Sequence, residues 1–220
     1  GDTVRWRDEL AGAAAHLPDD AALVFGFAVA DLRDESATGP VMSEMLRPVL
    51  AQLMDVPGCE ADLVAAGRWA AVGVRPSRGV AGADLDPEID VVVSGDWTRD
   101  AIEACALGLA KHQRGAAPDV TLTPSGAVTA ISGGRESIWL AWIDDQTFAF
   151  STRRDLDAPA MQARITGTSD GGPPPALAAM LDGVDRRAAV WFGGDVDGVR
   201  DSGDAVFGDG SGVRLAARLQ

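Results

Sequence analysis

The first part of the chain alternates between helical and strand-like spacing of apolar residues. A helix is predicted at the start, and its inward-facing residues are Trp6, Leu10, Ala14 and Leu17. Pro18 ends this helix before a predicted strand at 23–29. A second helix is predicted at about 41–54, with a kink or a late start at Pro48. This part is completed by two predicted strands, at 69–74 and 89–94, and by a predicted helix at 98–112. Thr98 can serve as the N-cap of that helix.

The middle of the chain reads as an antiparallel meander. Four short segments of high β propensity follow one another at 120–123, 128–132, 138–143 and 147–151. Asp144 and Asp145 separate the last two, and because both flanking runs are strongly apolar, they predict a tight hairpin turn. A helix is predicted at about 156–165.

Two segments of the chain are similar to each other. Residues 21–34 and 188–201 are identical at seven of 14 positions, and each follows an apolar pattern typical of a helix. We therefore predict an incomplete internal repeat, with a first unit at 1–166, a linker at 167–175 and a partial second unit at 176–220 that packs on the first. The second unit is predicted to end in a hairpin with strands at 205–208 and 213–219.

Strands that come in runs, rather than alternating one by one with helices, favour the α+β class. We expect an antiparallel sheet with helices packed on one face. In the segment 138–143 both alternating sets of positions are apolar, which is usual for a central core strand. A less common explanation is an interaction surface that includes Trp139 and Trp142.

Composition limits the classes of partner. With 220 residues and 46% apolar content the chain can bury a substantial core. Its formal net charge of -14 disfavours binding to nucleic acid or to an anionic lipid surface. No apolar run is long enough for a transmembrane helix, and a start at Gly1 suggests that a leader was removed.

Signals for catalysis are weak. Gly167 to Gly171 matches the G-x-S-x-G pattern of serine hydrolases, but a helix rather than a strand is predicted before it, and both histidines precede the serine. Cys105 and His112 lie too far apart along one helix to share a metal ion. The chain has only two cysteines, Cys59 and Cys105, and the residues allow either a disulfide or two buried thiols.

The stretch 194–212 is rich in aspartate and glycine. Asp195 and Asp197 followed by glycine form half of the start of an EF-hand loop, and Asp201 lies close behind. The distal glutamate of such a loop is missing, and the same residues are ordinary in solvated turns. Calcium is therefore the one candidate cofactor, and a turn without metal is the favoured interpretation.

Several motifs in their order resemble a known group of proteins. They are Leu17-Pro18-Asp19-Asp20, Cys59, Gly95-Asp96-Trp97, Cys105 and Trp142-Ile143-Asp144-Asp145-Gln146-Thr147. Over about residues 9 to 152 this order resembles secreted or lipid-anchored cell-envelope proteins of unknown function from myxobacteria. The resemblance implies a disulfide between Cys59 and Cys105 and a periplasmic, outer-membrane-anchored or extracellular location. It supplies no catalytic residues.

The leading hypothesis for function is a non-catalytic cell-envelope module for binding or scaffolding. Its partner would be an unknown protein or glycan. The alternatives are a hydrolase-type enzyme with a site of scattered carboxylates and arginines, and a calcium-stabilised surface domain.

Overall fold

The computed structural model of the protein describes residues 2–32, 59, 66–75, 88–113, 120–133, 136–167 and 172–194. The helical elements in these ranges are α1 (Asp2–Ala13), the short 3-10 helix η1 (Ala14–His16), α2 (Val29–Leu32), α5 (Arg99–Gln113), α6 (Ala158–Thr166) and α7 (Pro175–Met180). The strands are β1 (Leu23–Phe27), β2 (Gly67–Arg75), β3 (Glu88–Gly95), β4 (Thr121–Ser125), β5 (Val128–Gly133), β6 (Glu136–Trp142), β7 (Thr147–Ser151) and β8 (Val190–Gly194).

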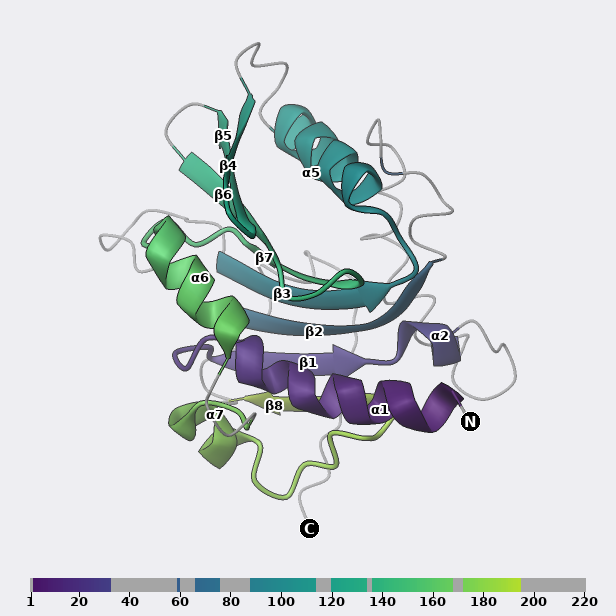
Figure 1. Ribbon diagram of the computed structural model, residues 1–220. Helices are drawn as coiled ribbons and strands as arrows, with labels where there is room; N and C mark the ends of the chain where they lie inside the picture. The colour runs from purple at the N-terminus through teal and green to yellow at the C-terminus, as the bar shows by residue number, and fades with distance from the viewer. Residues whose placement is uncertain are drawn as a thin grey trace, which may run out of the picture.

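All eight strands belong to one antiparallel sheet, in the order β4-β5-β6-β7-β3-β2-β1-β8 (Figure 1). Two meanders make up most of it, one of β1 to β3 and one of β4 to β7, and they join where β7 pairs with β3. This arrangement confirms the α+β class and the antiparallel meander. In Figure 1 the strands β4 to β6 run steeply against β1 to β3, which is the usual twist of a large sheet.

One face of the sheet is covered by α1, η1, α6 and α7. A row of small and apolar residues crosses this face, with one residue from each strand that it crosses. Each residue of the row lies directly opposite the next one on the neighbouring strand. The row consists of Trp191, Gly26, Ala71, Val92, Ala149, Ala141 and Val128. Leu10 of α1, Met161 of α6 and Leu177 of α7 are fully buried against it. Small residues in the centre of the row let the helices approach the sheet closely.

The opposite face carries α5 over the β5 to β7 half of the sheet. Ile102, Ala106 and Ala110 of α5 pack on Leu140 and Trp142 of β6. Leu140 and Ala141 are neighbours in β6, so their side chains point to opposite faces of the sheet. Leu140 belongs to the core under α5, and Ala141 belongs to the core under α1, α6 and α7. The expectation that the helices pack on one face therefore holds for α1, α6 and α7, whereas α5 lies on the other. Both faces of 138–143 are covered, as expected of a core strand.

Local sequence signals account for several element boundaries. The Thr98 hydroxyl accepts a hydrogen bond of 3.3 Å from the Ala101 amide, which confirms the predicted N-cap of α5. In the predicted hairpin, the Asp144 carboxylate accepts a bond of 2.8 Å from the Gln146 amide, and the Ile143 amide donates to the Thr147 carbonyl at 2.9 Å. These bonds turn the chain directly from β6 into β7.

The strands of the two similar segments are neighbours at one end of the sheet. β1 and β8 pair antiparallel, and Phe25 lies opposite Phe192, which occupies the equivalent position in the other segment. Before each strand an equivalent backbone bond recurs, from Ala21 to Pro18 at 3.4 Å and from Ala188 to Asp185 at 3.1 Å. An approximate local two-fold axis between Phe25 and Phe192 therefore relates the two strands. That the two segments arose by duplication stays a prediction.

Some predicted elements lie outside the described residues. They are the helix at 41–54 and the hairpin with strands at 205–208 and 213–219. The first predicted strand ends earlier than expected, at Phe27, because the chain enters the short helix α2 at Val29. The predicted domain boundaries stay predictions, although β8 adds directly to the sheet formed by the first unit and Leu177 of α7 is buried in the same core.

Candidate functional site

Charged side chains gather at one end of the helix-covered face of the sheet. They come from the loop before β1, the end of β2, the start of β3, the segment after β7 and helix α6. We call them the ion-pair network: Asp20, Arg75, Glu88, Asp90, Arg153, Asp155 and Arg164. Because the antiparallel register aligns these strand ends, residues distant in sequence meet in one place.

Arg75 is the centre of the network. Its Nη1 donates to Asp20 Oδ2 at 2.8 Å, and its Nη2 donates to Asp155 Oδ1 at 3.0 Å. Its Nε donates to Glu88 Oε2 at 2.8 Å, so one buried guanidinium binds three carboxylates. Burial alone would lower the pKa of Arg75, but the hydrogen bonds to Asp155, Glu88 and Asp20 raise it above its ordinary value.

Arg153 binds two of the same carboxylates. Its Nη1 and Nη2 donate to the two oxygens of Asp20 at 2.8 and 3.0 Å, and its Nε donates to Asp155 Oδ1 at 3.1 Å. Hydrogen bonds from Arg153 and Arg75 hold the pKa of Asp155 far below its usual range. Burial raises the pKa of Asp20, but the two arginines outweigh that effect and lower it overall. Both carboxylates therefore remain ionised at neutral pH.

Asp90 lies deeper, on β3, with only 2% of its surface exposed. Its Oδ1 accepts a hydrogen bond of 2.6 Å from Ser151 Oγ and also contacts Arg164 of α6. Its Oδ2 has no hydrogen-bond partner among the residues that the structure describes. Burial raises the pKa of Asp90 and lowers the pKa of Arg164, and their mutual attraction opposes both shifts only in part. This pair ties α6 to the sheet.

The geometry of the network limits its chemistry. Asp20 and Asp155 each accept hydrogen bonds from both Arg75 and Arg153, so their oxygens are engaged and their pKa values lie too low for a general base near neutral pH. Asp90 has a raised pKa but is buried away from any substrate. Among the described residues, no group of three or more His, Cys, Asp or Glu side chains is arranged to hold a metal ion.

An apolar surface lies on the β1 and β8 end of the sheet. Phe192 and Val190 of β8 are 55% and 38% exposed, and they are the large apolar side chains of the described residues with the greatest exposure. By register they lie opposite Phe25 and Phe27 of β1, whose half-buried rings stack with centroids 6.0 Å apart. We call these four residues the β8 patch. It faces away from α1, because the intervening Trp191 is buried on the α1 side.

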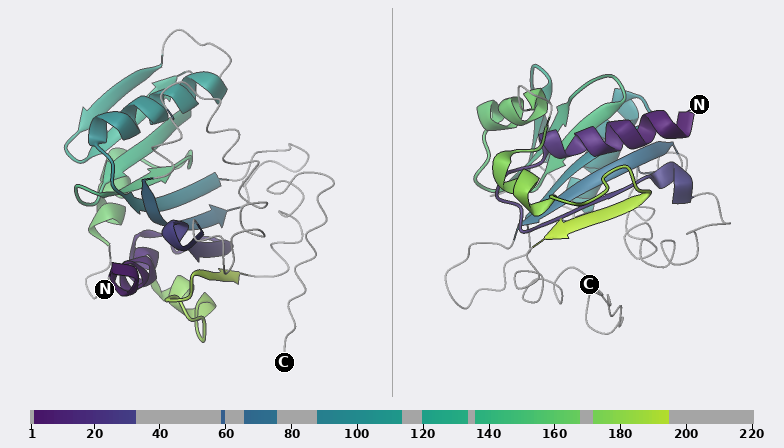
Figure 2. Two further views of the ribbon diagram at one scale, coloured as in Figure 1. Left: turned by 90° about the vertical axis from the view of Figure 1, so that its right-hand side faces the viewer. Right: turned by 90° about the horizontal axis from the view of Figure 1, so that it is seen from below.

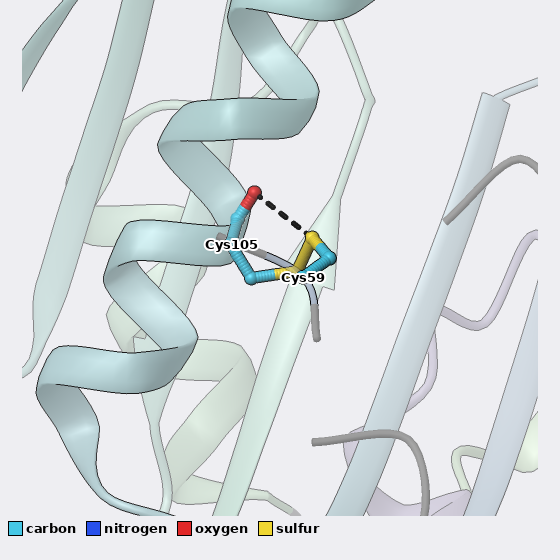
Figure 3. The surroundings of a disulfide bond; sticks show 2 residues. All are labelled: Cys59 and Cys105. Atoms are coloured by element: carbon cyan, nitrogen blue, oxygen red, sulfur yellow. Dashed lines mark hydrogen bonds between the residues drawn. A yellow bond between two sulfur atoms is a disulfide. The ribbon is translucent and has the colours of Figure 1, made fainter. Parts of the chain in front are cut away.

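Cys59 and Cys105 form a disulfide with Cα atoms 4.4 Å apart (Figure 3). Cys105 belongs to α5, and the Sγ of Cys59 also lies 3.4 Å from the Cys105 carbonyl oxygen. The bond thus fixes the residue at position 59 against α5. Of the two arrangements that the sequence allowed, the structure has the disulfide, and the described residues contain no free cysteine.

The structure places the other candidate residues of the sequence in different environments. Trp142 is 4% exposed and packs against Phe148, with the Arg99 guanidinium 5.1 Å from the centre of its ring, so the interaction surface proposed there is wrong for this residue. Trp139 is half-buried on the opposite face, where it packs on the core beneath the helices. The calcium candidates Asp195, Asp197 and Asp201 lie outside the described residues.

Sequence reasoning missed both the ion-pair network and the β8 patch. Asp90 gave a usable signal, because a carboxylate within an apolar strand is expensive to bury unless a partner neutralises it. Its partner Arg164 lies 74 residues away on a helix, and no local pattern links the two. For the β8 patch the signal was the lack of charge in Val190–Gly194.

The fold and these two features define an α+β protein with one antiparallel sheet and a closed internal charge network. No protein-family model matches the chain, and no curated protein matches it in sequence. Two solved crystal forms of TP0453, forms III and IV, are similar in structure with a TM-score of 0.39 each, at 10% and 8% identity. The matches cover 69% and 76% of this chain and 50% and 57% of TP0453, so the chain spans little more than half of that protein's length. At this TM-score the likeness supports no conclusion about function. Among the described residues, none of the helices has both the length and the apolar character needed to cross a bilayer.

Proposed function

We propose that the protein is a non-catalytic module of the cell envelope that binds or scaffolds a partner through the β8 patch. The observation that carries this proposal is the exposure of Phe192 and Val190 beside the half-buried rings of Phe25 and Phe27. Apolar side chains that cluster on the surface of a soluble protein commonly mark a contact site. Among the described residues the patch lies on the last strand of the sheet, where a partner can approach both the side chains and the backbone.

The ion-pair network supports a structural role for the charged residues. The alternative enzyme would use scattered carboxylates and arginines, and the structure does bring such groups together. Their hydrogen-bonding capacity is directed at one another, however, and Arg75 and Arg153 are themselves buried. A substrate would have to displace these internal bonds before it could reach a guanidinium. We therefore assign the network to holding the strand ends and α6 in place.

The envelope location rests on the disulfide. A bridge between Cys59 and Cys105 persists in an oxidising compartment and is rare in the cytosol. The resemblance to envelope proteins of myxobacteria favours the same location. The test is to quench cells of the source organism with acid, alkylate free thiols, and then reduce and alkylate again. The chain should be protected in the first step, take up two groups in the second, and fractionate with the envelope. A chain with free thiols in the cytosolic fraction would overturn the location.

The binding role is tested with the apolar dye bis-ANS on the folded protein. The dye should bind the wild type, and the Phe192→Ser variant should lose most of the fluorescence gain. Leu122→Ser is the matched control, because Leu122 is a half-buried apolar residue on the other edge strand, β4, and on the same face of the sheet. Circular dichroism checks that both variants fold. Equal dye binding by all three proteins would contradict the role assigned to the β8 patch.

A further inference from the structure

The strand β8 directs half of its backbone groups away from the sheet. The Ala28 amide donates to the Ala189 carbonyl at 2.8 Å, and this bond fixes which residues of β8 face β1. Because bonding alternates along an antiparallel pair, Trp191 and Gly193 bond toward β1, and the N–H and C=O groups of Val190, Phe192 and Gly194 point outward. Among the described residues β8 is the last strand at this end of the sheet (Figure 2).

The two end strands of the sheet differ in how well they resist pairing. β4, at one end, contains Pro124, which has no N–H to donate, and its side chains are mostly exposed. β8, at the other end, has neither proline nor charge, and its outward face carries the apolar side chains of Val190 and Phe192. Proteins usually protect such an edge with charges, prolines or bulges. In the part of the chain that the structure describes, β8 has none of these features, although the protein has a net charge of -14, and such an edge favours pairing with a further strand.

The neighbour of β8 within the chain indicates what kind of strand it accepts. β1 is similar to β8 in sequence, and the two pair antiparallel with Phe25 opposite Phe192. A strand of this sequence type therefore pairs with its own type in a register centred on phenylalanine. The strand most similar to β8 that is available in solution is the β8 of a second copy of the chain.

We propose that two copies of the protein associate through their β8 strands, antiparallel and centred on Phe192. Within each copy Phe192 occupies a position that is not hydrogen-bonded to β1, so its outward N–H and C=O can bond to those of the second copy's Phe192. A two-fold axis normal to the sheet keeps the same face of both sheets on one side. The two β8 patches then form one continuous apolar surface. This inference rests on the proposed binding role of the β8 patch and names its partner.

The first test is a cross-link. Because the native cysteines are paired with each other, a cysteine introduced by Phe192→Cys is the only free thiol in the variant. In the proposed register the two Cα atoms lie about 5.5 Å apart, a distance that a disulfide can span. The Phe192→Cys protein should form a covalent dimer under mild oxidation. Ser125→Cys, at an exposed position of β4, is the matched control and should stay mostly uncross-linked. Equal cross-linking of both variants would overturn the proposed register.

The second test is sedimentation equilibrium of the full chain. The wild type should have twice the mass of the chain, and Val190→Pro should have the mass of the monomer, because proline removes an outward N–H without removing a bond to β1. Val190→Thr keeps the N–H and should remain a dimer. A wild type that is monomeric at all accessible concentrations overturns the inference, and so does a dimer that survives Val190→Pro. A monomer that still binds bis-ANS through Phe192 would leave the proposed binding role intact, which separates the two failures.

Discussion

Trp191 and Gly26 provide a direct test of how β8 is held on the sheet. The two residues lie opposite each other, and the Trp191 ring occupies the space above Gly26. A Cβ atom added to Gly26 would lie 2.3, 2.4 and 2.6 Å from three atoms of that ring. Since carbon atoms in contact are normally about 3.5 to 4.0 Å apart, the ring has to move by about 1 Å or more. Gly26→Ala is therefore expected to be destabilising, although alanine is ordinarily favoured over glycine in a strand.

The burial of Trp191 sets the size of the effect. The ring is 3% exposed and belongs to the main core. If it shifts within its site, overpacking costs about 1 to 3 kcal/mol. If it leaves the core, the cost approaches the roughly 3 to 5 kcal/mol of truncating a buried tryptophan. We expect Gly26→Ala to lower the free energy of unfolding by about 2 to 4 kcal/mol.

A double-mutant cycle isolates this contact. Urea unfolding followed by circular dichroism is measured for the wild type, Gly26→Ala, Trp191→Leu and the double variant. With leucine at 191 the new methyl group has room, so Gly26→Ala should then cost less than about 0.5 kcal/mol. The coupling between the two positions should be about 1.5 kcal/mol or more. If Gly26→Ala costs the same in both backgrounds, the ring does not pack on Gly26 and the reasoning is refuted.

Two further predictions concern the disulfide and the ion-pair network. Replacing both Cys59 and Cys105 with alanine opens a bond between residues 46 apart and should lower the free energy of unfolding by about 4 kcal/mol in the chain-entropy model, measured by urea unfolding against the oxidised wild type. The reduced wild type should lose a similar amount, and a cost near zero would contradict a stabilising role. Because the pKa values of Asp20 and Asp155 are lowered in the folded state, their stabilisation is present above the unfolded value near 4 and is lost as the pH falls below it. Both side chains are more than a third exposed, so together they contribute only about 1 kcal/mol to the free energy of unfolding. The Asp20→Asn/Asp155→Asn variant should therefore lose less stability than the wild type as the pH falls from about 5 to about 2. Because the pKa of Asp90 is raised in the folded state, its contribution to stability changes with pH in the opposite direction. An acid-unfolding profile that is the same in the variant and the wild type would show that Asp20 and Asp155 are not the groups that titrate.

Local chemistry explains why much of the fold could be predicted from the sequence. The strand β7 and the turn before it were predictable because Asp144 bonds to a backbone amide only two residues away. The start of α5 was predictable because Thr98 caps an amide three residues away. The side of the sheet that α5 covers was not predictable, because its apolar face fits either side equally well. That choice depends on the connection between two meanders, which has no local signature.

The ion-pair network could not be predicted for a related reason. Arg75 and Glu88 meet across a strand pair, and Asp20 and Asp155 approach from loops 55 and 80 residues away from Arg75. Each is an ordinary surface residue by sequence alone, and a chain with 33 acidic residues offers many such combinations. The register of β2 and β3 places Arg75 opposite Glu88, and the chain before β1 and after β7 brings Asp20 and Asp155 to the same place. The hypothesis of scattered carboxylates and arginines thus described the composition of the cluster without locating it.

The pairing of β1 with β8 connects the sequence similarity to the proposed association. Two similar strands in one chain can either lie in separate, equivalent places or pair with each other. Here they pair, so one edge of β1 is hydrogen-bonded to β8 and its other edge is hydrogen-bonded to β2. β8 has no such second strand among the described residues, and its outward groups are those of Val190, Phe192 and Gly194, the set that does not bond to β1. The β8 of a second copy is an apolar, extended strand, and in the proposed antiparallel register it pairs with these outward groups.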